Sequence, residues 1–157
     1  EVGAEVRWEE TKDAERARKA GAGAGVLDGI AAGLPALMRA EKLQKRAARV
    51  GFDWPEARQV IDKIREEIDE VDAEIAAAAP DRARIEGEIG DLLFAIVNLA
   101  RHLDVDSETA LRGCSAKFER RFNQIERALG AQGRDPRGAT LDEMEALWVE
   151  AKLAERR

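Results

Sequence analysis

Apolar residues recur every third or fourth position along most of this chain, which is the spacing of a helix with one apolar face. The clearest run ends before Pro80. Its apolar positions are Ile61, Ile64, Ile68, Val71 and Ile75. The same spacing recurs in residues 37–50, 81–103, 107–129 and 140–152. Since no segment alternates with the period of a strand, we expect an all-α, antiparallel four-helix-bundle-like domain that buries these apolar faces.

Start and stop signals separate the expected helices. Asp53 is a candidate N-cap ahead of an early proline, and Pro80 with Asp81 ends one helix and opens the next. Thr140 and Glu143 have the spacing of a capping box. These signals predict short connections, which favour antiparallel neighbours.

Composition and charge exclude several classes of function. The chain of 157 residues has 32 acidic and 26 basic side chains, and its net charge of −6 disfavours binding to a nucleic-acid polymer. The single cysteine, Cys114, cannot form an intrachain disulfide, and the single histidine, His102, cannot build a multi-histidine metal site. No apolar stretch reaches the roughly 20 residues of a membrane span. We expect a soluble, cytoplasmic protein with no membrane association.

Two pairs of carboxylates occupy consecutive expected helices. Glu67 and Glu70 are three residues apart beside the apolar stripe, and Glu88 and Asp91 repeat that spacing on the next helix. Because apolar residues follow Asp91 directly, we expect its carboxylate to be partly buried. An antiparallel turn would bring all four carboxylates into one pocket, where a cation relieves their repulsion. Oxygen-only ligands favour Mg²⁺, with Mn²⁺ as the alternative.

Two other interpretations fit these acidic residues. They could be solvated charges paired with Lys63, Arg65 and Arg84, and a single pair of this kind is usually no more than that. A di-iron carboxylate bundle is the other competitor. It needs two Glu-x-x-His motifs, which a chain with one histidine lacks.

Basic and aromatic residues on the last two expected helices fit a nucleotide. Lys117 and Arg121 share one helix face with Arg120 beside them, and Trp148 and Lys152 share a face of the last helix. Cations bind phosphates and an indole can stack on a base. Trp148 as a plain core residue and Arg120 as a solvated charge are the alternatives.

At this point the sequence resembles the MazG nucleotide pyrophosphohydrolases, specifically the C-terminal domain of two-domain bacterial members. The resemblance covers residues 33–152. It is carried by Gly33-Leu34-Pro35-Ala36-Leu37, Lys42-Leu43-Gln44-Lys45-Arg46-Ala47-Ala48, Gly51-Phe52-Asp53-Trp54, Glu66-Glu67-Ile68-Asp69-Glu70, Glu88-Ile89-Gly90-Asp91-Leu92-Leu93-Phe94, Asn98-Leu99-Ala100-Arg101, Lys117-Phe118-Glu119-Arg120-Arg121 and Glu145-Ala146-Leu147-Trp148.

This resemblance implies a dimeric all-α enzyme that hydrolyses nucleoside triphosphates to monophosphate and pyrophosphate with Mg²⁺. The family's metal ligands fall on Glu67, Glu70, Glu88 and Asp91. Its nucleotide-contacting stretches fall on Lys63 to Glu67, Arg84 to Gly87, Lys117 to Arg121 and Trp148, to which we add Lys152. We expect Glu67, Glu66 and Asp91 to be catalytic, with one of the two glutamates as the base. Two departures from the family pattern, at Gly87 and Ser107, touch no metal ligand.

The resemblance also suggests how the chain is divided. The pattern Trp-x-Glu-x-Lys occurs at Trp8 and again at Trp148. We therefore interpret residues 1–19 as the tail of a missing N-terminal domain, residues 20–32 as a Gly- and Ala-rich linker, and residues 33–157 as the catalytic domain. A broad base preference and removal of non-canonical nucleotides are expected. The alternatives are a more restricted dUTP or phosphoribosyl-ATP type of hydrolase and a non-catalytic helical interaction module.

Overall fold

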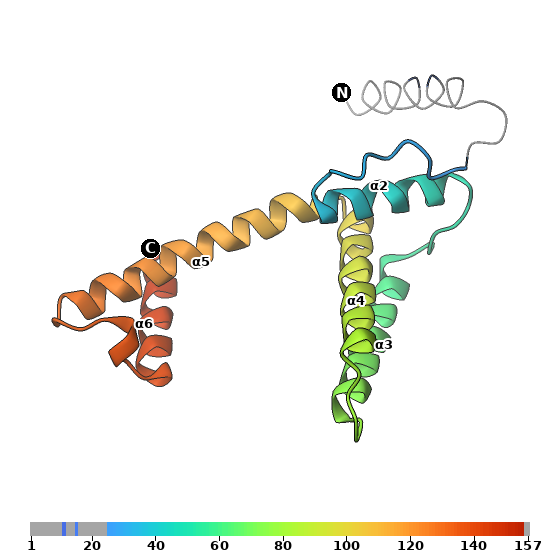
Figure 1. Ribbon diagram of the computed structural model, residues 1–157. Coiled ribbons are helices and arrows are strands. Elements are labelled where there is room, and N and C mark those ends of the chain that lie inside the picture. Colours follow the sequence, from blue (N-terminus) through green and yellow to red (C-terminus); the bar gives the residue numbers. More distant parts are fainter. Residues whose placement is uncertain (1–10, 12–14, 16–24, 156–157) are drawn as a thin grey trace. The chain divides into compact units, whose positions relative to one another are not determined.

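The computed structural model describes residues 11, 15 and 25–155 (Figure 1). Its helices are α2 (Ala36–Arg49), α3 (Ala57–Ala76), α4 (Arg82–His102), α5 (Ser107–Gly130) and α6 (Leu141–Ala154), with the 3-10 turn η1 (Pro136–Gly138) before α6. No described residue lies in a strand, so the all-α fold class is confirmed. None of the described helices combines the length and the hydropathy needed to cross a membrane.

The described residues fall into two compact units that divide between Ser107 and Glu108. The first unit contains α2, α3 and α4, and the second contains nearly all of α5 together with α6. Apart from residues 11 and 15, the expected tail at 1–19 lies outside the described residues, and so do residues 20–24 of the expected linker, whereas residues 25–32 of that linker are described.

Helices α3 and α4 form an antiparallel hairpin in the first unit (Figure 1). Val60 near the start of α3 and Val97 near the end of α4 are both almost completely buried. The turn between the helices ends at Asp81, whose side chain accepts a hydrogen bond from the backbone N–H of Ala83 and caps α4. The short turn fixes the level at which residues of α3 face residues of α4.

Helix α2 packs against α4. The Gln44 side chain is buried, and its Nε2 donates to the backbone oxygen of Phe94 at 2.8 Å. Arg46, on the same helix, donates to the backbone oxygens of Val26 and Asp28, which holds the segment before α2 against that helix. Polar contacts of α2 therefore reach both α4 and the preceding loop.

Asp53 does not cap α3, contrary to the sequence-based expectation. The helix begins at Ala57 after Glu56, which makes no side-chain cap. The Asp53 carboxylate instead accepts a hydrogen bond from Arg101 Nη2 and lies 3.2 Å from His102 Nε2; these are the last two residues of α4. Because these two basic side chains meet Asp53, its carboxylate ties the α2–α3 loop to the end of α4.

The second unit is closed by polar contacts at the start of α6. Thr140 and Glu143 form the predicted capping box, in which each side chain accepts from the backbone N–H of the other. Arg134 donates to both Glu143 carboxylate oxygens at 2.8 and 3.0 Å, and also to the backbone oxygen of Gly138. The buried apolar residues of the second unit include Ile125, Leu129 and Ala151.

The expectation that the apolar stripe of α3 is buried is wrong for part of its length. Ile68 is 50% exposed and Ile75 is 59% exposed. Phe118 and Leu111 on α5, which were also expected to face a core, are exposed as well. Helical periodicity identifies an apolar face, but burial depends on whether another element covers that face.

The contact between Arg134 and Glu143 predicts a pH-dependent contribution to stability. The hydrogen bonds from Arg134 lower the pKa of Glu143 from its ordinary 4.5 to about 2. A carboxylate with a lowered pKa stabilises the fold above its unfolded-state pKa, and that contribution is lost as the pH falls through the folded-state pKa. We expect Glu143→Gln, which keeps a capping-box side chain, to lower Tm by a few degrees at pH 7.

The difference in Tm between this variant and the wild type should narrow as the pH falls from 4.5 towards 2, in thermal melts followed by circular dichroism. Glu150→Gln, which changes an exposed carboxylate of the same helix, is the matched control and should leave Tm unchanged. A loss of Tm that is the same at every pH would show that the ion pair is not its source.

Candidate functional site

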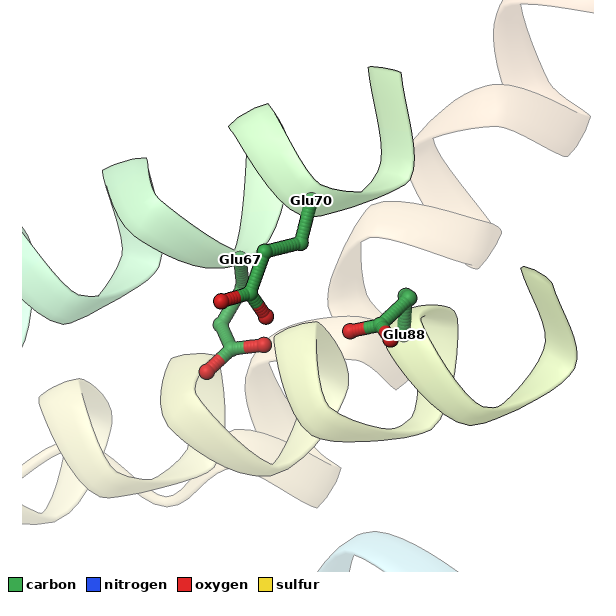
Figure 2. Close-up of side chains that lie close together, drawn as sticks. All are labelled: Glu67, Glu70 and Glu88. Atoms are coloured by element: carbon green, nitrogen blue, oxygen red, sulfur yellow. The ribbon is translucent and has the colours of Figure 1, made fainter. Parts of the chain in front are cut away.

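Three carboxylates meet where α3 and α4 face each other. Glu67 and Glu70 extend from α3 towards Glu88 on α4 (Figure 2). One oxygen from each of the three lies within 4.8 Å of the others. The antiparallel hairpin thus brings together three of the four predicted metal ligands.

Glu67 is the buried member of this carboxylate cluster. It is only 4% exposed, and its Oε2 has no hydrogen-bond partner within the described structure. Its Oε1 forms an ion pair with Lys63 Nζ at 2.7 Å, and this contact raises the pKa of Lys63. Leaving a buried carboxylate oxygen unpaired is costly, so Oε2 is an acceptor oriented for a further positive group.

The other two carboxylates add negative charge at the same point. The charge of Glu67, followed by a hydrogen bond with Glu88, raises the pKa of Glu70 above its ordinary value. A raised pKa of this origin means that the ionised cluster repels itself when no cation is present. A hard divalent cation fits this donor set, because it takes carboxylate oxygens and keeps part of its water shell.

Asp91, the fourth predicted ligand, lies outside the group of carboxylates within 4.8 Å. The expectation that it is partly buried is wrong for the described chain, where Asp91 is exposed. It follows Glu88 by three residues on α4, which places it on the same helix face about 4.5 Å further along the axis. The apolar residues after Asp91 did not produce burial, because Leu93 and Phe94 are exposed themselves.

The remaining predicted residues of the first unit lie on the two helices of the hairpin. Glu66 makes an ion pair with Lys63 at 3.3 Å, so Lys63 contacts two neighbouring glutamates. Arg84 contacts Glu74 across the end of the hairpin at 3.4 Å. Gly87 is exposed within α4, and a Cβ there would meet nothing within 4 Å.

The predicted cations and the indole lie in the second unit. Lys117, Arg120 and Arg121 are on α5, and Trp148 and Lys152 are on α6. The Arg121 guanidinium lies 5.4 Å from the centre of the Trp148 ring, and the Trp148 and Phe118 ring centres are also 5.4 Å apart. A cation over an indole at this distance is a favourable contact.

Glu155 is a member of this group that the sequence-based reasoning missed. Its Oε2 accepts from Arg121 Nε at 3.0 Å and from Arg121 Nη2 at 2.7 Å, and its Oε1 lies 3.9 Å from Arg120. The hydrogen bond from Arg121 is the largest cause that lowers the pKa of Glu155. The signal was available, because Trp148, Lys152 and Glu155 are spaced by four and three residues on one helix face.

Comparison with known proteins finds a similar family and similar relatives. Residues 56–125 match the family model of the MazG nucleotide pyrophosphohydrolase domain. This range includes all of α3 and α4 and the part of α5 that carries the three cations. It therefore contains the carboxylate cluster but ends before Trp148.

Curated relatives align over nearly the whole chain. The nucleoside triphosphate pyrophosphohydrolase of Escherichia coli K12 is 52% identical over 150 residues, which are 96% of this chain and 56% of that protein. The nucleoside triphosphate pyrophosphohydrolase/pyrophosphatase MazG of Thermotoga maritima is 36% identical over 146 residues, 93% of this chain and 54% of the relative. The uncharacterized protein YabN of Bacillus subtilis is 41% identical over 97% of this chain and 30% of its own length.

The chain spans about half the length of the first two relatives named here. The segment that matches the family model contains the carboxylates of α3 and α4. The chain is therefore similar to the MazG nucleotide pyrophosphohydrolase domain over residues 56–125 and to the named relatives over nearly its whole length.

Proposed function

We propose that this domain hydrolyses nucleoside triphosphates to nucleoside monophosphate and pyrophosphate in a reaction that depends on Mg²⁺. The observation that carries the proposal is the carboxylate cluster of Glu67, Glu70 and Glu88, with one buried oxygen left unpaired. The names of the relatives from Escherichia coli and Thermotoga maritima support the reaction class.

The carboxylates would hold Mg²⁺, with Mn²⁺ as the alternative. The ligands would be Glu67, Glu70 and Glu88, joined by Asp91 from the next turn of α4. A cation bound there supplies charge neutralisation for the phosphate oxygens of the substrate. Lys63 keeps one oxygen of Glu67 engaged, which leaves the other oxygen for the cation.

In this proposal the side chains of the protein bind the substrate and remove a proton from the attacking water. A water oxygen forms a bond to the α-phosphorus, the bond from that phosphorus to the bridging oxygen breaks, and pyrophosphate leaves with the electron pair. Glu66 or Glu67 accepts the proton of the water. Glu66 is the more exposed of the two, whereas Glu67 belongs to the cluster.

Basic side chains would bind the rest of the substrate. We assign the outer phosphates to Lys117, Arg120 and Arg121, because guanidinium and ammonium groups bind phosphate oxygens. Trp148 and Lys152 would contact the nucleoside, and Lys63, Arg84 and Gly87 complete the predicted contacts. Stacking on an indole distinguishes bases weakly, which favours a broad base preference and a role in removing non-canonical nucleotides.

The working form would be a homodimer in the cytoplasm, without a nucleic-acid or membrane partner. On α4 the exposed apolar side chains include Ile89, Leu93 and Ile96, spaced by four and three residues on one face. A contiguous apolar face of this kind marks an association surface. A second copy of this chain is the proposed occupant, because a two-fold interface pairs a face with itself.

Product analysis tests the reaction. We expect a panel of nucleoside triphosphates to yield monophosphate and pyrophosphate with Mg²⁺ and nothing with a chelator, as resolved by ion-exchange chromatography. Asp91→Ala should reduce turnover by at least 100-fold, on the order of a lost metal-dependent step. Products restricted to one nucleotide would favour the narrower hydrolase, and no product from any triphosphate would refute the proposal.

Thermal melts test the metal site independently of turnover. Mg²⁺ should raise Tm by several degrees, since a ligand that binds only the folded state stabilises it. Glu88→Gln should remove most of this rise, and without Mg²⁺ it should raise Tm because one repelling charge is gone. The matched control is Glu86→Gln on an exposed position of α4, which should keep the Mg²⁺ response. An equal response in both variants would place the cation elsewhere.

The oligomeric state tests the apolar face of α4. We expect the wild type to sediment as a dimer and Leu93→Lys to sediment as a monomer, because burying an unpaired ammonium in an apolar interface is unfavourable. Val149→Lys on α6 changes a side chain of similar exposure and should remain dimeric. A monomeric wild type, or a dimeric Leu93→Lys variant, would remove this face from the interface.

A further inference from the structure

The Arg121 side chain is held at two points, by Trp148 on α6 and by Glu155, the C-cap residue of that helix. Its Nε and Nη2 both donate to Glu155 Oε2, and its guanidinium lies over the Trp148 ring. Trp148 lies on α6, and Glu155, seven residues later, is the C-cap residue of that helix and keeps a helical backbone conformation, so both side chains lie on the same side of it. Both restraints on Arg121 thus come from α6 and the residue that ends it.

The burial of Arg121 makes the Glu155 contact more than a surface ion pair. The Arg121 side chain is only 12% exposed, whereas that of its neighbour Arg120 is 62% exposed. A guanidinium with so little access to water needs a carboxylate nearby to remain in that position. Without Glu155, the Arg121 side chain would gain hydration by rotating away from Trp148.

The contact leaves part of the Arg121 hydrogen-bonding capacity unused by Glu155. A guanidinium has five N–H groups in a fixed fork, and Glu155 receives one from Nε and one from Nη2. The other three stay in the orientation that the carboxylate and the indole impose. Glu155 therefore does not use the three N–H groups that a phosphate group would bind.

We infer that Glu155 is a positioning residue that orients Arg121 to bind a phosphate group of the triphosphate substrate. The inference rests on the proposed function, in which Arg121 contacts the phosphates. Glu155 itself touches neither substrate nor cation in this scheme. Because Glu155 holds Arg121 in place before the substrate binds, the Arg121 side chain loses less conformational entropy on binding.

A substitution that removes the charge of Glu155 distinguishes positioning from simple electrostatics, because the two predict opposite changes in affinity for an anion. Glu155 sits near Lys117, Arg120 and Arg121, which all lower its pKa. Removing its negative charge leaves these cations less neutralised, so Coulomb attraction alone predicts tighter binding of an anion. Positioning predicts the opposite result, weaker binding, because Arg121 is no longer held.

The test measures binding and turnover in the full chain. The probe is α,β-methylene-ATP with Mg²⁺, whose methylene bridge resists cleavage, titrated by calorimetry. We expect Glu155→Gln to raise Kd about tenfold, equivalent to about 1.4 kcal/mol. The KM of a hydrolysed triphosphate should rise by a similar factor with kcat within about twofold, the pattern of a lost binding contact.

Matched variants make the interpretation specific. Glu155→Asp, which retains the carboxylate, should recover at least part of the affinity. Glu150→Gln removes an exposed charge from the same helix and should bind as the wild type does. In an Arg121→Gln background, Glu155→Gln should have no further effect, because the two residues act as one unit.

The outcomes distinguish this inference from the proposed function. If the wild type yields no monophosphate and pyrophosphate from any triphosphate, the proposed function fails, while the binding titration still reports on Glu155. If the wild type is active but Glu155→Gln binds the probe equally or more tightly, only the positioning role is overturned. A wild type that does not bind the probe, or effects of the two substitutions that add, would overturn it as well.

Discussion

Repulsion among carboxylates at the α3–α4 hairpin is the constraint on which the proposed function depends. The fold places Glu67, Glu70 and Glu88 together and buries the first of them, although like charges at this distance destabilise the helices that carry them. Lys63 neutralises one oxygen of Glu67 and leaves the other unpaired. A sequence selected only for stability would place apolar or paired side chains there, and the proposed cation site accounts for the cluster.

Local sequence signals predicted the helices well because helix formation depends on near neighbours. Asp81 and Thr140 cap α4 and α6 as expected, and the antiparallel α3–α4 turn brings three predicted ligands together. What failed involved residues distant in sequence. Asp53 forms a hydrogen bond with Arg101, 48 residues away, instead of capping α3. Glu155, which binds Arg121, lies 34 residues beyond it. Such pairs depend on how helices pack, which periodicity alone does not specify.

Burial was also mispredicted for a physical reason. A run such as Ile61 to Ile75 shows which side of α3 is apolar, but it does not show what covers that side. Ile68 and Ile75 remain about half exposed, and so do Ile89 and Leu93 on α4. The expectation that Asp91 is partly buried failed with them, because it assumed that its apolar neighbours were covered. An apolar surface of this extent is unfavourable in water, and it is the surface on which the proposed dimer rests.

Charge acts in opposite ways on the two groups of residues assigned to the substrate. In the proposed function the carboxylates of α3 and α4 would repel a triphosphate until a cation binds, whereas the cations of α5 would attract its phosphates directly. In a protein with a net charge of −6, attraction for an anion must come from such local groups rather than from the overall field. Glu155 lowers the net positive charge beside Arg121, so its presence reduces attraction over distance. Its contribution is therefore better explained by the orientation of Arg121 than by charge, since orientation is the property that a carboxylate on Nε and Nη2 supplies.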